Sequence, residues 1–320
     1  MPADPPELVA EIKHAIDDVA LQKPDALAAF DRNPFQGIYS LTSIEPEEDA
    51  RVIPKMLGWQ PALDALKTAG VTNPRFSSGF SLSKPAGGPA LYWHRCAAPP
   101  LALVKEDGAQ PLPFSRSDWH YWSFAQESGL ARGTQLFLML YLVDTSPENG
   151  CLRVLPRSHL GRVELDELVP AETESAHGGR ENWGEDLEAD PELPEEVQEM
   201  VSTWPGAVDV AVKAGDLIIG DSRLYHAAYE NKSPDRRTCI TMWYLDWDQC
   251  TPELRATYTG SRDPAAHPCG IPCATEHERA LMKPLIPDYD GDLSIAGQSS
   301  RLLGDWGHTP IEVDGGAAKL

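Results

Sequence analysis

Short apolar runs separated by turn residues fill the middle of the chain, from about Ser77 to Trp247, and they constrain its fold most strongly. Such runs predict β-strands, here at 90–94, 135–143, 151–155, 208–212, 217–219 and 238–245. A Pro-Glu-Asn-Gly turn at 147–150 divides two of them. Many short strands with few helices between them predict a mainly β protein with flanking helices, built as a jelly roll of two sheets.

Helical periodicity is confined to the two ends of the chain. Apolar residues recur at helical spacing between Pro6 and Phe30, and a second helix is expected from Trp59 to a stop at Gly70. A third is expected at 276–282, within a Pro- and Gly-rich tail. We therefore expect one domain, with an N-terminal helical flank over 1–76, a β core over 77–250 and a C-terminal extension over 251–320.

Charge and hydropathy exclude several classes of partner. The formal net charge of -22 would repel a polyanion, so we expect no nucleic-acid partner. No apolar run reaches the length of a membrane span, and the first residues lack the pattern of a secretory signal, so we expect a cytoplasmic protein. The acidic residues concentrate at 164–199, which we interpret as a solvated insertion, with a lid over a site as the alternative.

One histidine and one arginine stand out in the last third of the β core. His226 closes an apolar run that begins at Leu217, and Arg237 opens the next run eleven residues later. We expect the two to lie on neighbouring strands. A neutral imidazole is a common metal ligand, and a guanidinium grips a carboxylate with two parallel hydrogen bonds, so the pair indicates a metal site that also binds an acid.

A non-haem iron(II) site needs two imidazoles and one carboxylate on one face of the metal. Besides His226, the second imidazole and the carboxylate have two candidate sources, the strand that ends at His94 and the cluster Asp118-Trp119-His120-Tyr121-Trp122. A histidine among aromatic residues is more often a packed, hydrogen-bonded side chain than a ligand. We interpret His159 and His177 as structural or surface residues.

Together these segments resemble the phytanoyl-CoA dioxygenase family of iron(II)- and 2-oxoglutarate-dependent oxygenases. The resemblance spans roughly Ser77 to Trp247 and rests on five blocks, at 91–94, 118–122, 135–142, 148–159 and 214–237. It implies a double-stranded β-helix, which is a cupin-like jelly roll. It also implies an H-x-D pair, a distal histidine and an arginine soon after that histidine.

Carried over residue by residue, the resemblance implies that iron(II) is bound by His94, Asp118 and His226, with His120 as the fallback ligand. Arg237 is implied to hold the far carboxylate of 2-oxoglutarate. Arg236 is the alternative, although successive strand residues face opposite ways, so only one of the two points inward.

The remaining site assignments concern the cosubstrate and the substrate. Gln135 and Thr241 are expected to touch 2-oxoglutarate. The expected lining of the substrate pocket, with plain core packing as an equal alternative, is Trp119, Tyr121 and Trp122. The block 156–159 matches a structural turn of the family, and we assign it no catalytic role.

The implied reaction uses O2 and 2-oxoglutarate to hydroxylate a C–H bond of a small organic substrate, and it releases succinate and carbon dioxide. The acidic surface argues against a highly anionic substrate such as a CoA thioester, because long-range steering would oppose its approach.

The chain departs from the family at the H-x-D pair. His94 is followed by Arg95-Cys96, and the expected Asp-Trp text appears only at Asp118, after an insertion at about 96–117. This insertion is either a genuine loop or non-native text from a wrong gene model. We favour the second hypothesis, because an H-x-D turn holds both ligands by local geometry that an insertion would lose. The alternative functions are a catalytically impaired family member, a small-ligand-binding jelly roll and a zinc hydrolase.

Overall fold

Two antiparallel sheets form the centre of the molecule. The computed structural model describes residues 5–19, 22, 38–40, 52–88, 90–94, 132–160, 204–260 and 275–295. The five-stranded sheet has the order β1 (Ile38–Ser40), β2 (Pro74–Lys84), β9 (Arg237–Asp246), β4 (Gln135–Tyr141) and β7 (Leu217–Asp221). The four-stranded sheet has the order β3 (Leu91–His94), β8 (His226–Ala228), β5 (Leu152–Val154) and β6 (Val208–Val210).

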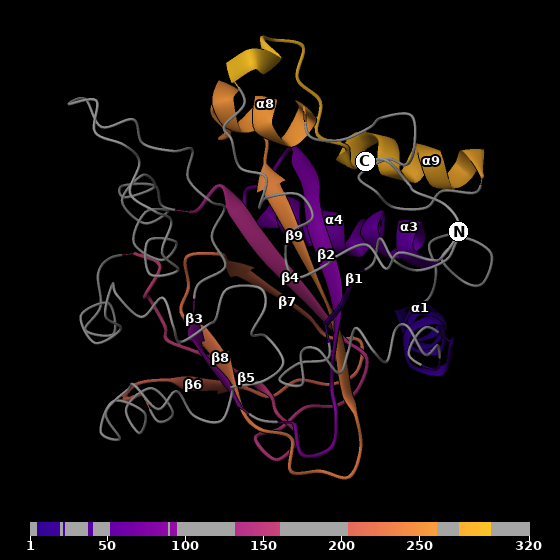
Figure 1. Cartoon of the computed structure of the whole chain (residues 1–320), viewed down its shortest axis with the longest axis vertical. Coiled ribbons are helices and arrows are strands. Elements are labelled where there is room, and N and C mark those ends of the chain that lie inside the picture. Colours follow the sequence, from indigo (N-terminus) through magenta and orange to yellow (C-terminus); the bar gives the residue numbers. More distant parts are fainter. Residues whose placement is uncertain are drawn as a thin grey trace, which may run out of the picture.

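The chain passes repeatedly from one sheet to the other. β2, β4, β7 and β9 belong to the first sheet, whereas β3, β5, β6 and β8, which lie between them in sequence, belong to the second. Every described strand pair is antiparallel. Figure 1 shows the shorter sheet beside the long strands of the larger one. This topology confirms the predicted double-stranded β-helix.

β4 is buried on both of its faces, which explains the unbroken apolar run that follows Gln135. Leu136, Leu138 and Leu140 belong to the apolar cluster that includes the flanking helices. The alternate residues belong to a second cluster, which lies between the sheets and includes Leu152 of β5. Because successive strand residues face opposite sides, one short segment contributes to two cores.

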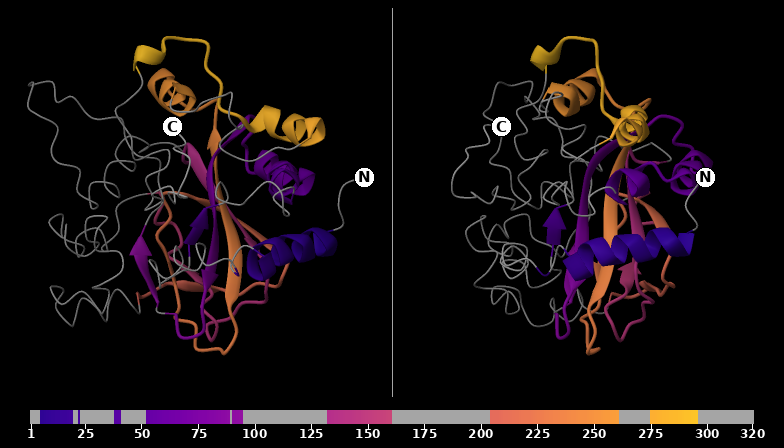
Figure 2. Two further views of the ribbon diagram at one scale, coloured as in Figure 1. Left: turned by 45° about the vertical axis from the view of Figure 1, so that its right-hand side comes forward. Right: turned by 90° about the vertical axis from the view of Figure 1, so that its right-hand side faces the viewer.

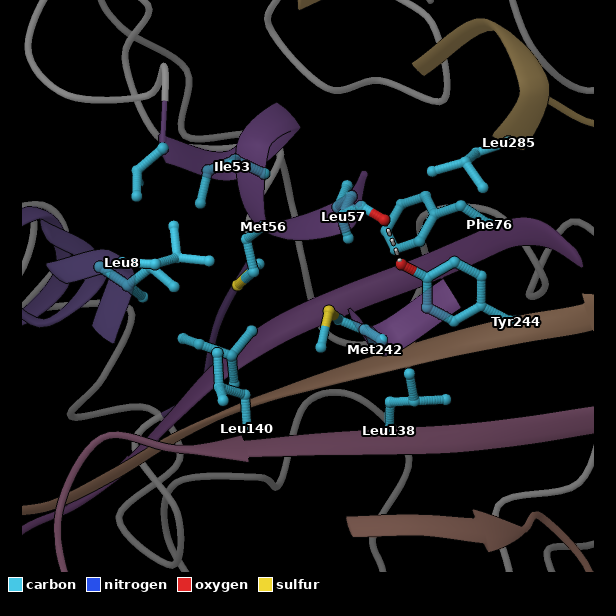
Figure 3. Packing of buried hydrophobic residues seen from close by; sticks show 14 of the residues in the cluster. Leu8, Ile53, Met56, Leu57, Phe76, Leu138, Leu140, Met242, Tyr244 and Leu285 are labelled. Atoms are coloured by element: carbon cyan, nitrogen blue, oxygen red, sulfur yellow. Dashed lines mark hydrogen bonds between the residues drawn. The ribbon is translucent and has the colours of Figure 1, made fainter. Parts of the chain in front are cut away.

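The helices cover the outer face of the larger sheet (Figure 2). They are α1 (Pro5–Lys13), which continues as the π-helix η1 (His14–Val19), then α3 (Val52–Leu57), α4 (Gln60–Thr68) and α9 (Glu276–Met282). Figure 3 shows Leu8 and Met56 from these helices packed near Leu140 and Met242 of the sheet. The Tyr244 hydroxyl donates a hydrogen bond of 3.0 Å to the Leu57 carbonyl oxygen in the same layer.

The helices at the two ends were predicted with different success. α9 spans the expected residues, because Thr275 and Glu278 form a capping box that sets its first turn. Gly70 has a φ of 90° just after α4, as its predicted role as a helix stop requires. The sequence analysis missed α3 and α8 (Pro252–Gly260), and also the short 3-10 helices η6 (Lys283–Leu285) and η7 (Leu293–Ile295).

Both predicted insertions, at 96–117 and at 164–199, lie outside the described residues. The helix expected over residues 6–30 is described only as far as Val19. In the described part of the chain, no helix has the length and apolar character needed to span a membrane.

Candidate metal and cosubstrate site

His226 begins a strand of its own. The apolar run before it forms β7, which ends at Asp221, and a turn then carries the chain to the other sheet, where β8 starts at His226. Arg237 starts β9 in the larger sheet. The expectation that His226 and Arg237 lie on neighbouring strands is therefore wrong, because they belong to two different, facing sheets.

The turn before His226 is closed by an ion pair that the sequence analysis missed. The Arg223 guanidinium donates to both carboxylate oxygens of Asp221, at 2.9 and 2.7 Å, and the Gly133 amide donates to the same carboxylate. Burial alone would raise the pKa of Asp221, but these hydrogen bonds outweigh it and lower that pKa. The charged pair therefore ends the apolar run where the chain changes sheets.

A second support comes from the block at 156–159. The Ser158 hydroxyl accepts a hydrogen bond of 2.8 Å from the Tyr225 amide, and the Leu155 amide donates to the Tyr225 carbonyl at 2.9 Å. Arg157 has a φ of 68°, which closes the turn around Ser158. This block touches the residue directly before His226, so it is a structural turn that supports β8.

The His226 imidazole is buried in its neutral form. Only 7% of the residue is exposed, and its ring packs against Phe137 with centroids 5.2 Å apart. Burial lowers the pKa of His226 to about 4. Nδ1 lies 2.8 Å from the Leu224 carbonyl oxygen, which can only accept, so Nδ1 carries the proton. Nε2 then holds the lone pair that a metal ion requires.

The backbone of β3 brings a second histidine to the same place. The Cα atom of His94 pairs with that of His226 across the two antiparallel strands. The two histidines are far apart in sequence, and the sheet makes them direct neighbours.

Arg237 is buried at the start of β9, with 2% of its surface exposed. One terminal nitrogen donates to the Cys239 sulfur at 3.1 Å, while Nε has no hydrogen-bond partner among the described residues. Arg236 is only partly buried and donates to the Ser83 carbonyl at 3.2 Å. Of the two candidate arginines, Arg237 therefore faces the space between the sheets.

Lys84 adds a buried amine that the sequence analysis did not identify. It ends β2 directly opposite Arg237 in the register, and its Nζ donates to the Tyr229 carbonyl at 2.7 Å. Burial, followed by the Arg237 charge, lowers the pKa of Lys84 to about 6. Two cations side by side in an apolar interior carry a high cost, which a bound anion would offset. A lysine that follows Phe80 and Leu82 at strand spacing was the available signal.

Gln135 and Thr241 also belong to the space between the sheets. Thr241 alternates with Arg237 and Cys239 along β9, so the three side chains share a face. Gln135 is buried and shares its face of β4 with Phe137, the ring that packs on His226. Its amide nitrogen lies 3.3 Å from the Ser77 hydroxyl.

The other predicted site residues lie outside the described part of the chain. These are Asp118, Trp119, His120, Tyr121 and Trp122. His177, which we interpreted as a structural or surface residue, also lies outside the described residues. Within the described ranges, no group of three or more His, Cys, Asp or Glu residues that could hold a metal ion is found.

Comparison with known proteins gives a family match. The model of the family described as "Phytanoyl-CoA dioxygenase (PhyH)" matches residues 102–239, which include His226 and Arg237. An ectoine dioxygenase from Nocardia farcinica is 24% identical over 260 residues, covering 75% of this chain and 85% of that protein.

Solved structures of similar proteins include two with low sequence identity to this chain. The non-heme alpha-ketoglutarate-dependent carbocyclase SnoK from nogalamycin biosynthesis is 18% identical, covering 74% of this chain and 75% of its own, with a TM-score of 0.45. HygX from Streptomyces hygroscopicus, with nickel and 2-oxoglutarate bound, is 17% identical, covering 75% and 78%, with a TM-score of 0.44. The family match and the ectoine dioxygenase confirm the resemblance seen in the sequence, which is to the phytanoyl-CoA dioxygenase family of iron(II)- and 2-oxoglutarate-dependent oxygenases.

Proposed function

We propose that this chain is an iron(II)- and 2-oxoglutarate-dependent dioxygenase that hydroxylates a C–H bond of a small organic substrate. One observation carries the proposal. A buried, neutral His226 lies on one sheet, and a buried Arg237 lies on the sheet that faces it. A metal ligand and an anion anchor on opposite walls of one interior suit a cosubstrate that has a chelating end and a carboxylate end.

The residues fit the proposed metal. His94, His226 and Asp118 would be the ligands, because two imidazoles and one carboxylate are the donor set of non-haem iron(II) oxygenases. The register of His94 opposite His226 and the protonation of His226 at Nδ1 support this assignment. Asp118 enters from the family pattern alone. When bound, the iron supplies the activation of dioxygen and the oxidation of the substrate.

Arg237 would bind the far carboxylate of 2-oxoglutarate. Its planar guanidinium matches a carboxylate with two parallel hydrogen bonds, and its buried Nε would gain an acceptor. Lys84, opposite Arg237 in the register, would add a second positive charge to the same carboxylate. Gln135 and Thr241 would contact the cosubstrate from the same interior.

The walls around this site are mainly apolar. Phe137, Met139, Tyr141 and Leu152 form the cluster between the sheets. Such walls exclude water and strengthen the electrostatic grip on the cosubstrate. The similarity to an ectoine dioxygenase supports a small substrate over a CoA thioester.

The test is anaerobic binding of iron(II) followed by 2-oxoglutarate, monitored by charge-transfer absorption, with O2-dependent succinate formation as the second readout. Replacing Arg237 by Met should weaken 2-oxoglutarate binding by about 100-fold, because charge-assisted hydrogen bonds are lost from a buried site. Replacing the neighbouring Arg236 by Met is the matched control and should change the affinity little.

A chain shortened by residues 96–117 separates the proposed function from its alternatives. Metal and 2-oxoglutarate binding by the full chain supports a dioxygenase with a genuine loop. Binding by the shortened chain alone identifies the segment as non-native and the full chain as impaired. If neither chain binds iron, or if both arginine variants behave alike, the proposed function or the role of Arg237 is wrong.

A further inference from the structure

β3 contains one residue more than its partner strand between their two paired positions. Leu91 pairs with Ala228, and His94 pairs with His226, so three steps along β3 match two steps along β8. With an unbroken register, Trp93 would stand opposite His226. The bulge instead gives this position to His94, because one extra residue exchanges the faces of everything that follows it.

Trp93 lies on the outer face of the smaller sheet. It is buried, with 3% of its surface exposed, and it packs in a cluster with Leu155, Trp204, Tyr225 and Ala227. Ala227 alternates along β8 with His226, whose ring contacts Phe137 between the sheets. The bulge has therefore moved Trp93 to the side of the sheet that faces away from the proposed metal site.

Arg153 links Trp93 to the rest of this sheet. It stands on β5 opposite Ala227, and β8 separates β5 from β3. Its guanidinium carbon lies 5.2 Å from the centroid of the Trp93 ring and 4.3 Å from that of the Tyr229 ring. Because Ala227 has only a methyl group, the long Arg153 side chain can pass over β8 and reach Trp93. The buried Arg153 guanidinium thus contacts both the Trp93 ring of β3 and the Tyr229 ring, which follows β8.

β3 needs such a contact to hold its register. Among the described strands it lies at the edge of its sheet, and it has two described paired positions with β8. A strand with few ladder pairs has a weakly specified register. Its register becomes well specified when one of its side chains is fixed on one face of the sheet. A cation over an indole ring is strongest when both groups are removed from water, as they are here.

We propose that Arg153 is a positioning residue for the metal site. Arg153 holds Trp93 on the outer face of the smaller sheet, and this keeps β3 in the bulged register that sets His94 opposite His226. This inference rests on the proposed function, because it takes the two histidines as iron ligands. Arg153 itself touches neither the metal nor the cosubstrate in this account.

The test replaces Arg153 by Met, which keeps a long apolar side chain and removes the cation. Iron(II) affinity should fall at least about tenfold, as is usual when groups behind a ligand are removed. Amide hydrogen exchange in the peptide that contains residues 90–94 should become faster. Replacing Arg153 by Lys should restore much of both, because the ammonium also binds a ring face.

A matched control exists elsewhere in the chain. The Arg255 guanidinium lies 5.6 Å from the centroid of the Trp247 ring, away from β3. Replacing Arg255 by Met removes a similar ring contact, together with two hydrogen bonds to the Trp247 carbonyl, and should leave iron(II) affinity and exchange in β3 unchanged. An equal loss in both variants would mean a general effect on stability and would overturn the inference.

A Trp93→Leu variant covers the case in which Arg153→Met fails to fold. Trp93→Leu keeps the cation but removes the ring, so it should weaken iron(II) binding to a similar extent. Unchanged affinity in either folded variant would overturn the positioning role. If the unmodified protein binds no iron while Arg153→Met still speeds exchange in β3, the proposed function fails and the register role stands.

Discussion

Replacing Gly220 by Ala tests how tightly the site is built around Phe137. The two residues face each other on β7 and β4, and a Cβ atom at Gly220 would lie 2.1 Å from Phe137 Cζ. Carbon atoms pack at about 3.5 Å, so the ring would have to move by about 1.4 Å. The next ring along is that of His226, with its centroid 5.2 Å away, so the movement would reach the proposed ligand.

We expect this variant to lose about 1–3 kcal/mol of unfolding free energy, the usual cost of an overpacked core. Iron(II) affinity should fall as well, because the His226 ring would lose its position. Urea denaturation measures the first effect, and anaerobic iron titration measures the second. Adding Phe137→Leu should relieve the clash and restore stability more than metal affinity, since the smaller side chain no longer packs on the imidazole. A Gly220→Ala protein with unchanged stability and metal affinity would refute this reasoning.

Three further outcomes follow from single contacts. Because the pKa of Lys84 is about 6, affinity for the dianion 2-oxoglutarate should fall as the pH rises above 6, and Lys84→Met should remove that dependence in calorimetric titrations. Tyr244→Phe leaves the buried Leu57 carbonyl without its donor and should lower the unfolding free energy by about 1–3 kcal/mol in urea, with 2-oxoglutarate affinity unchanged. Thr275→Ala removes a helix cap and should lower the melting temperature, at a cost of about 1 kcal/mol.

Local patterns were sufficient for much of the fold. β4 was identified because the unbroken apolar run after Gln135 leaves few alternatives to a strand covered on both faces. α9 was located correctly because its cap and its first turn lie within four residues of each other. These signals depend on neighbours in sequence, so no tertiary information was needed.

Contacts between distant segments explain what was missed. β8 has only three residues, His226–Ala228, too few for a periodic pattern. His226 and Arg237 lie in facing sheets because the chain turns at Asp221 and Arg223. An aspartate and an arginine two residues apart do not by themselves predict such a turn. The importance of Lys84 depends on its position opposite Arg237, a residue more than a hundred positions away.

The sequence by itself determined the β character of the core, the family resemblance and the residue types available for a metal and for a carboxylate. Only the tertiary structure decided which side chains share an interior and in what ionic form. Burial makes His226 neutral and lowers the pKa of Lys84, and the bulge in β3 sets His94 opposite His226. The physical reason is that solvation and register belong to packed surfaces, which form from segments far apart along the chain.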